Sequence, residues 1–154
     1  MVLPLSRAIA YRVYQDLRQG LIRKVTMKAL IILDDKESLE SISQAFQMCL
    51  PECKLVSTNL GEKGSELVGS ESPDIVILDL NLPDVSGFDV LKQIRCCSQV
   101  PVIILSFLRD EADTVEALEL GADEYIAKPF RQLEFMARIR ALLRKSSFKE
   151  SKVS

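Results

Sequence analysis

The alternation of short, wholly apolar runs with amphipathic stretches is the feature that most constrains the fold of this chain. Apolar runs recur from residue 29 onward, and stretches with apolar residues at helical spacing separate them. Continuous apolar runs are typical of strands buried on both faces of a parallel sheet, and the stretches between them of crossover helices. Residues 27–145 therefore predict an α/β domain of five βα units, and a chain of 154 residues buries a single core.

The expected elements follow one another in a regular order. We expect strands at 29–33, 54–57, 75–78, 102–105 and 125–127, and helices at 38–49, 62–68, 88–95, 110–120 and 132–143. Pro51, Gly69 and Gly121 mark the ends of three of these helices. Right-handed crossovers then place helices on both faces of the sheet and gather the carboxyl ends of the strands at one edge.

Polar side chains follow four of the five predicted strands. They are Asp34 and Asp35, Asp79, Ser106 and Lys128. Carboxylates gathered at one edge repel one another unless a proton or a cation is present, and Mg²⁺ prefers such oxygen ligands. Lys128 and Ser106 add a charge and a hydroxyl that suit phosphoryl oxygens, which makes Asp79 a candidate nucleophile. Each residue has a simpler individual explanation as a cap, turn, surface or strand-end residue, which we prefer for all but Asp79 when they are taken singly. Their shared edge nevertheless favours a site.

Composition excludes several kinds of chemistry. The chain has no histidine, so it has no histidine general base, no Ser–His or Cys–His pair and no histidine zinc ligand. The cysteines lack the C-x-x-C spacing of zinc sites, and we expect them to be small buried apolar residues: Cys49, Cys53, Cys96 and Cys97. No apolar run is long enough to span a bilayer and no secretory signal opens the chain, which indicates a cytoplasmic protein.

Charge is distributed unevenly along the chain. Residues 1–28 carry a net charge of +5, residues 29–139 of −11 and residues 140–154 of +4. An acidic domain does not attract nucleic-acid phosphates, so we expect no direct nucleic-acid binding by the central domain. Any contact with DNA would belong to the ends or to a domain outside this sequence.

Residues 1–26 lie outside the βα pattern and form a separate extension. Apolar residues recur at every fourth position between basic ones, which predicts an amphipathic helix. The simplest explanation is that this helix packs on the domain or mediates oligomerisation. The next is that residues 1–26 are upstream sequence ahead of a true start at Met27. Binding to an anionic surface also stays open. A faint resemblance of Ala10–Ile22 to the first helix of GntR-like DNA-binding domains lacks a recognition helix behind it.

Four segments, in order, carry a specific resemblance. They are Leu-Asp-Asp at 33–35, Val-Ile-Leu-Asp-Leu-Asn-Leu-Pro-Asp-Val-Ser-Gly at 76–87, Val-Ile-Ile-Leu-Ser at 102–106 and Leu-Gly-Ala-Asp-Glu-Tyr-Ile-Ala-Lys-Pro-Phe at 120–130. Through them, residues 27–145 resemble the receiver domain of two-component response regulators, with a pattern closest to the OmpR-like regulators. The resemblance implies a flavodoxin-like (βα)5 fold, a doubly wound sheet of five parallel strands in the order 2-1-3-4-5, to which the N-terminal amphipathic helix is added.

The same resemblance implies a role for each acidic site residue. Asp79 matches the residue that accepts a phosphoryl group from a sensor histidine kinase or a phosphotransfer protein. The matching Mg²⁺ ligands are Asp34, Asp35, Asp79 and the backbone carbonyl of Asn81. We therefore expect a signalling switch rather than an enzyme with an external substrate, although autophosphorylation and autodephosphorylation take place at Asp79. The alternative is a receiver-like interaction module that works without phosphorylation.

The resemblance also covers the residues that respond to the phosphoryl group. Ser106 and Tyr125 match the switch pair, and Lys128 matches the phosphate-binding lysine. Phe107 is a departure, because the family usually has a small residue there. Its bulk is expected to narrow the access to Asp79 and to slow both gain and loss of the phosphoryl group.

A homodimer through the 110–145 surface is a further implication. Two cross-dimer charge pairs of the OmpR-like regulators have counterparts here, Glu119 with Arg140 and Glu124 with Arg138. Thr114, however, stands where a basic partner for Glu134 is usual, which weakens the expected dimer.

The C-terminal end of the sequence lies beyond the receiver-like segment. Residues 146–154 are a tail or the start of a linker to an output domain, absent from this sequence, that would control transcription.

A haloacid-dehalogenase-type phosphatase needs an aspartate where Asn81 stands. A flavodoxin-like electron carrier needs a first loop rich in Thr, Ser and Gly, whereas residues 34–38 are acidic and repel a phosphate.

Overall fold

The computed structural model describes residues 9, 11–12, 27–107 and 110–152, with the backbone alone at 147–152. The extension predicted as a helix at 1–26 therefore lies outside the described residues, except at its positions 9, 11 and 12, which are helical.

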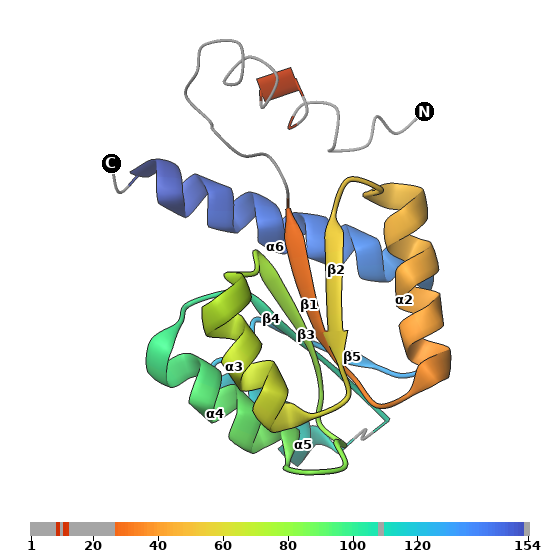
Figure 1. The fold of residues 1–154 in the computed structure, drawn as a ribbon, viewed down its shortest axis with the longest axis vertical. Helices are drawn as coiled ribbons and strands as arrows, with labels where there is room; N and C mark the ends of the chain where they lie inside the picture. Colours follow the sequence, from red (N-terminus) through yellow and green to blue (C-terminus); the bar gives the residue numbers. More distant parts are fainter. Residues whose placement is uncertain (1–8, 10, 13–26, 108–109, 153–154) are drawn as a thin grey trace.

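Five strands alternate with five helices over the described part of the chain from residue 28 onward (Figure 1). The strands are β1 (Lys28–Ile32), β2 (Lys54–Thr58), β3 (Ile75–Asp79), β4 (Val102–Ser106) and β5 (Glu124–Ala127), and the helices are α2 (Lys36–Cys49), α3 (Gly61–Glu71), α4 (Gly87–Cys97), α5 (Glu111–Glu119) and α6 (Gln132–Lys152). All strand pairs are parallel, and the order is β2-β1-β3-β4-β5. The predicted fold class and strand order are confirmed.

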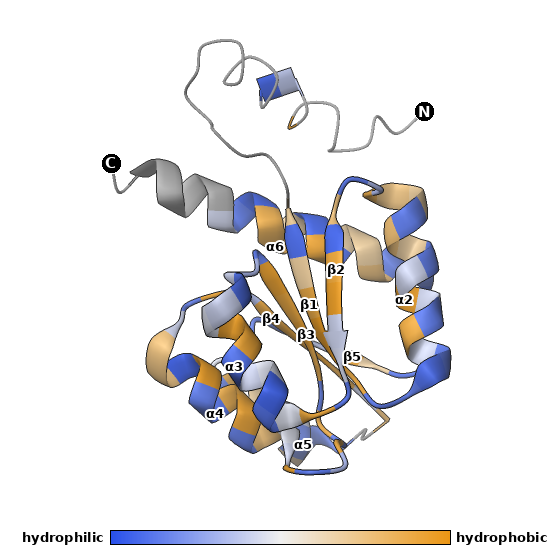
Figure 2. Ribbon diagram, in the orientation of Figure 1, coloured by the Kyte–Doolittle hydropathy of each residue, from blue (hydrophilic) through white to orange (hydrophobic). Residues whose placement is uncertain are grey.

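Two apolar clusters hold the layers together, one on each face of the sheet. Successive side chains of a strand point to opposite faces, so Ala29 and Ile31 of β1 belong to the cluster under α2 and α6. Leu30 and Ile32 belong to the cluster under α3, α4 and α5. Figure 2 shows apolar residues along the strands and polar ones on the outer sides of the helices. Burial of each such Leu or Ile side chain stabilises the fold by about 1.5–3 kcal/mol.

Three helices end later than the sequence predicts, and for α4 the difference is the two residues up to Cys97. Gly69 stays helical, and α3 ends instead at Glu71, followed by the C-cap residue Ser72, whose φ of 47° is left-handed. Helix α6 continues past the predicted end at Leu143 to Lys152, because no Gly or Pro interrupts this segment. In the described part of the chain no helix, α6 included, combines the length and the apolar character needed to cross a membrane.

The cysteines differ from one another in their exposure. Cys49 and Cys53 pack half-buried against the first cluster, and burial raises the pKa of the Cys53 thiol to about 11. Cys96 and Cys97 are exposed in the last turn of α4, so the expectation of four buried thiols is wrong for this pair. The apolar face of α4 ends at Ile94, which leaves the following turn to solvent.

Candidate functional site

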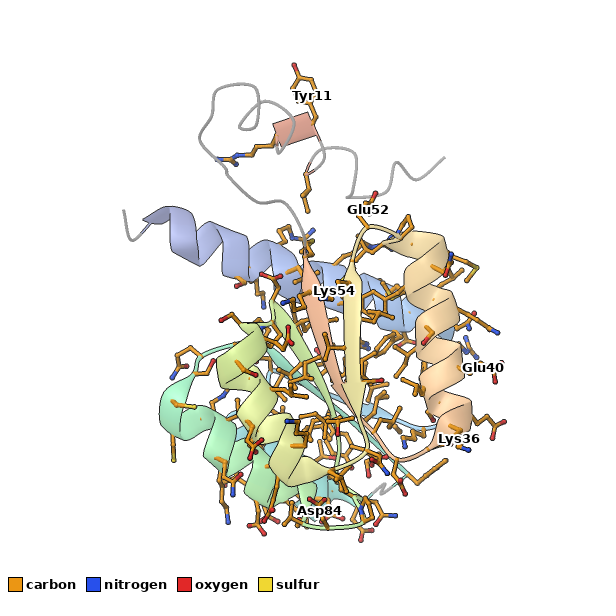
Figure 3. The ribbon with its side chains drawn as sticks, in the orientation of Figure 1. Tyr11, Lys36, Glu40, Glu52, Lys54 and Asp84 are labelled. Carbon is orange, nitrogen blue, oxygen red and sulfur yellow. The ribbon has the colours of Figure 1, made fainter. Side chains whose placement is uncertain are left out.

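The carboxyl ends of the parallel strands form the edge at which the sequence places its site residues. Asp79 and Ser106 are the last residues of β3 and β4, and Lys128 directly follows β5. Figure 3 shows Lys36 and Asp84 at this end of the sheet and Glu52 at the opposite end. The strand order reverses between β1 and β3, which is where doubly wound sheets open a crevice for ligands.

A buried ion pair lies at the centre of this edge. The Lys128 ammonium donates a hydrogen bond of 2.5 Å from Nζ to Asp79 Oδ2, and the two residues are only 1% and 3% exposed. Asp35 Oδ2 lies 3.6 Å from the same Nζ. Buried charges are stable only when they are paired, so this contact fixes both side chains. The structure thus brings together Asp35, Asp79 and Lys128 as expected from the sequence, and the cluster keeps a net negative charge.

Asp35 combines a structural contact with its place in the site. It is the N-cap of α2 and accepts a hydrogen bond of 3.1 Å from the backbone N–H of Glu37, and a short one from the Ser38 hydroxyl. The Ser38 contact, backbone hydrogen bonds and the charge of Lys128 hold the pKa of Asp35 below its usual value, against the effect of burial. The carboxylate is therefore ionised and oriented at neutral pH.

The remaining acidic residue, Asp34, faces a different partner. Asn59 Nδ2 donates to Asp34 Oδ1 at 3.4 Å. Within the described ranges, no three acidic or cysteine side chains gather closely enough to hold a metal ion by themselves. Mg²⁺ needs only one or two carboxylates, because it keeps several of its waters. Asp35 and Asp79, which both contact Lys128, are a donor set of this kind.

The loop between β3 and α4 is folded back on Asp79. The backbone N–H of Asn81 donates to Asp79 Oδ1 at 3.0 Å, and Gly87 N–H donates to the carbonyl of Leu80 at 3.0 Å. A Cβ atom at Gly87 would collide with the backbone of Asp79 and Leu80, so only glycine fits there. Both Asp79 carboxylate oxygens are thus occupied, one by Asn81 and one by Lys128.

Asp84 fastens the same loop to α3. Its carboxylate accepts hydrogen bonds from the backbone N–H groups of Gly61 at 2.8 Å and Glu62 at 3.1 Å, which lowers its pKa. Unpaired N–H groups at a helix N-terminus favour such an anionic acceptor. The loop that carries Asn81 is therefore held in its middle by Asp84 as well as at its two ends.

The predicted switch residues also meet. Ser106 is fully buried, and Tyr125 packs partly buried against the second cluster. Burial raises the pKa of the Tyr125 phenol, and hydrogen bonding with Ser106 and Thr114 partly offsets this effect. Ser106 also accepts the backbone N–H of Lys128 at 2.8 Å through its carbonyl. The Ser106 hydroxyl at the end of β4 is thus hydrogen-bonded to the phenol of Tyr125 on β5.

Residues 29–140 match the response regulator receiver domain family. The chain belongs to this family. It is 36% identical over 121 residues to the transcriptional regulatory protein KdpE of Mycobacterium tuberculosis, which covers 79% of this chain and 53% of KdpE. It is 40% identical over 123 residues to the cell cycle response regulator CtrA of Brucella ovis, which covers 78% of this chain and 51% of CtrA. This receiver domain therefore spans about half the length of the curated relatives it matches.

Solved structures agree with the fold of this receiver domain. The Francisella response regulator 1452 receiver domain is 28% identical with a TM-score of 0.72, over 79% of this chain and 99% of that one. A CheY-like response regulator receiver domain protein from Methanospirillum hungatei is 21% identical with a TM-score of 0.74, over 81% of this chain and 99% of the other. At that identity the second similarity concerns the fold alone.

Phe107 lies at the rim of the receiver's site. Its ring covers Lys128, with 4.8 Å between Nζ and the ring centroid, and 62% of the residue is exposed. Phe107 is therefore next to the acidic site, as its position after Ser106 predicts.

The predicted dimer surface of the receiver holds a charge cluster within one chain. Arg138 Nη1 donates to Glu124 Oε1 at 2.7 Å, and Nη2 donates to Glu134 Oε1 at 3.1 Å. The two carboxylates raise the pKa of Arg138. Glu134, which lacks a basic residue at Thr114, thus pairs with Arg138 of its own chain.

Three contacts of the site were missed by the sequence analysis. Ser38 follows the α2 cap by three residues, a spacing typical of capping boxes, so a signal for it existed. Asn59 and Asp84 reach partners 25 and 23 residues away, and no local pattern marks such contacts.

Proposed function

We propose that this receiver accepts a phosphoryl group on Asp79 from the phosphohistidine of a sensor histidine kinase or phosphotransfer protein. The observation that carries the proposal is the buried contact of 2.5 Å between Lys128 Nζ and Asp79 Oδ2 at the carboxyl edge of the sheet. A carboxylate oxygen of Asp79 attacks phosphorus as the P–N bond breaks, and the electron pair of that bond stays on the imidazole nitrogen. Lys128 then pairs with a phosphoryl oxygen instead of the free carboxylate.

The acidic residues fit a bound Mg²⁺. Asp35, Asp79 and the backbone carbonyl of Asn81 would hold the ion directly, and Asp34 would hold its waters. When bound, Mg²⁺ neutralises charge on the phosphoryl oxygens. Ser38 and the α2 N-terminus keep Asp35 ionised and oriented for this role.

The switch pair transmits a conformational change from the phosphorylated site to the surface formed by β5 and α6. The Ser106 hydroxyl moves toward the phosphoryl group, and Tyr125, its hydrogen-bonding neighbour, follows inward. The partners on that surface are a second copy, through Glu119, Glu124, Arg138 and Arg140, or an output domain outside this chain. The relatives named as transcriptional and cell cycle regulators support control of transcription through such a domain, without nucleic-acid contacts by the receiver itself.

We divide the chain as residues 1–26, an extension, residues 27–145, the receiver, and residues 146–154, a tail or linker start. The family match over 29–140 supports the central boundaries. A cytoplasmic location, typical of response regulators, goes with this assignment.

Intact mass of the purified chain after treatment with acetyl phosphate tests the proposal. We expect one added phosphoryl group that requires Mg²⁺, disappears with a chelator and is absent from Asp79→Ala. No added mass, under conditions that label another receiver, would contradict the proposal.

A phosphorylation-independent interaction module is the alternative. The observation that favours it is the Phe107 ring over Lys128, since a ring that acted as a steric screen there would keep a phosphodonor from Asp79. An unlabelled wild-type chain beside a labelled Phe107→Ala variant would mean that the acceptor chemistry is intact but occluded.

A further inference from the structure

The contact between Phe107 and Lys128 is a cation–π interaction as well as a steric one. Phe107 is a large apolar side chain that is 62% exposed, whereas Lys128 beneath it is only 1% exposed. The ammonium lies 4.8 Å from the ring centroid, within the roughly 6 Å over which a ring face attracts a cation. The ring thus lies between the buried charge and the outside of the molecule.

The contacts described for the ammonium head include two kinds. Asp79 Oδ2 at 2.5 Å and Asp35 Oδ2 at 3.6 Å are charged partners, and the Phe107 ring is an uncharged one. A lysine head is a point charge on a flexible stem, so its contacts decide where the charge lies. In the proposed reaction the Asp79 carboxylate exchanges Lys128 for phosphorus, whereas the ring face takes no part in the bond changes.

We infer that Phe107 is a positioning residue that holds the Lys128 ammonium beside Asp79 through its ring face. This inference rests on the proposed function of Asp79. As the Asp79 oxygen forms its bond to phosphorus, the ammonium leaves the free carboxylate for a phosphoryl oxygen. The ring keeps the ammonium from swinging outward during that exchange. The aromatic face, not the size of the side chain, is the property that matters.

Three substitutions of Phe107 distinguish the effect of its aromatic ring face from the effect of its side-chain size. Phe107→Tyr keeps the aromatic face, Phe107→Leu keeps much of the bulk without it, and Phe107→Ala removes both. Met48→Ala is the matched control, because Met48 is an equally exposed apolar residue, at 62%, on α2.

The first readout needs no phosphoryl donor. In NMR spectra of the unmodified protein, the Lys128 ε-methylene protons should show an upfield ring-current shift in wild type, Phe107→Tyr and Met48→Ala. The shift should be lost in Phe107→Leu. A shift that is equally absent from wild type overturns the inference, whatever Asp79 does.

The second readout is the rate of phosphoryl gain from acetyl phosphate with Mg²⁺, followed by intact mass. We expect Phe107→Tyr and Met48→Ala to match wild type, and Phe107→Leu to be slower by about three- to tenfold, as loss of a partly desolvated cation–π contact predicts. A Leu variant as fast as wild type, beside a faster Ala variant, would make the ring a steric screen and overturn the inference. A ring-current shift in a wild-type chain that takes no phosphoryl group would instead contradict the proposed function itself.

Discussion

At the scale of single residues, the Ser38 hydroxyl has a measurable effect on Asp35. Its hydrogen bond, as the first of several causes, lowers the folded-state pKa of Asp35 below 3.8. A depressed pKa contributes stability above the unfolded value, and the contribution is lost as the pH falls through the folded value. Ser38→Ala should therefore lower the free energy of unfolding by about 1 kcal/mol at pH 7, with a loss that shrinks as the pH falls below about 4.

Urea denaturation at several pH values measures this effect. Ser43→Ala is the control, because the Ser43 hydroxyl donates to the Leu39 carbonyl at 2.9 Å on the same helix and touches no carboxylate in that bond. Its cost should not vary with pH. An equal loss for Ser38→Ala at pH 7 and in acid would contradict the assigned role.

The Lys128–Asp79 pair predicts strong coupling between two residues. Lys128→Met leaves a buried carboxylate without its closest cation and should lower the free energy of unfolding by about 3 kcal/mol. Together with Asp79→Asn, a double-mutant cycle by chemical denaturation should give a coupling energy of about 1–3 kcal/mol. The exposed pair Lys92–Asp89, with 3.9 Å between Nζ and Oδ1, is the comparison and should give less than about 0.5 kcal/mol. Equal coupling energies in the two pairs would contradict the prediction that burial strengthens the Lys128–Asp79 interaction.

At the scale of elements, two glycines of α3 predict opposite outcomes. A Cβ at Gly64 would come within 2.7 Å of Ile32 Cγ1, because the helix packs closely on β1 there, whereas at Gly69 it would meet nothing within 4 Å. Gly64→Ala should lower the free energy of unfolding by about 1–3 kcal/mol. Gly69→Ala should raise it by about 0.5–1 kcal/mol, since alanine loses less backbone entropy in a helix. Thermal unfolding of both variants checks this, and a shift of the same sign would refute it.

Sequence patterns predicted the elements well because each strand is apolar enough to be recognised alone. The run from Ile75 to Leu78 is buried along its whole length, and its boundaries agree with β3 to one residue. The ends of helices were harder to predict. Gly69 has the right type for a helix end, but Ser72, three residues further on, adopts the left-handed conformation before Pro73.

At the scale of the whole molecule, the charge cluster on α6 predicts how the chain associates. If Arg138 serves a cross-dimer pair, its contact with Glu134 of the same chain competes with that pair. Glu134→Ala should then tighten the dimer of the phosphorylated protein by about two- to fivefold, as expected for one exposed ion pair. Arg138→Ala should weaken it.

Sedimentation equilibrium with and without acetyl phosphate measures this association. Glu66→Ala, which breaks the exposed Lys63–Glu66 pair on α3, is the control and should leave the dissociation constant unchanged. A tighter dimer for the control as well would point to a general effect of removing negative charge.

The composition of the site followed from topology, but its pairings did not. Parallel strands bring their carboxyl ends to one edge, so Asp35, Asp79, Ser106 and Lys128 were identifiable from their order alone. The direction of each side chain depends on loops that pack against distant elements. The sequence therefore could not predict that Asp34 accepts a hydrogen bond from Asn59, while Asp35 and Asp79 contact Lys128.

The separation of Asp79 and Lys128 along the chain has a consequence for the biogenesis of the protein. The two residues are 49 positions apart, and the lysine follows the last strand of the sheet. A growing polypeptide on the ribosome therefore displays the acceptor aspartate long before its cation exists. A nascent chain that ends ahead of residue 128 lacks the ion pair, so the receiver gains a complete site only after the last strand of its sheet has been synthesised.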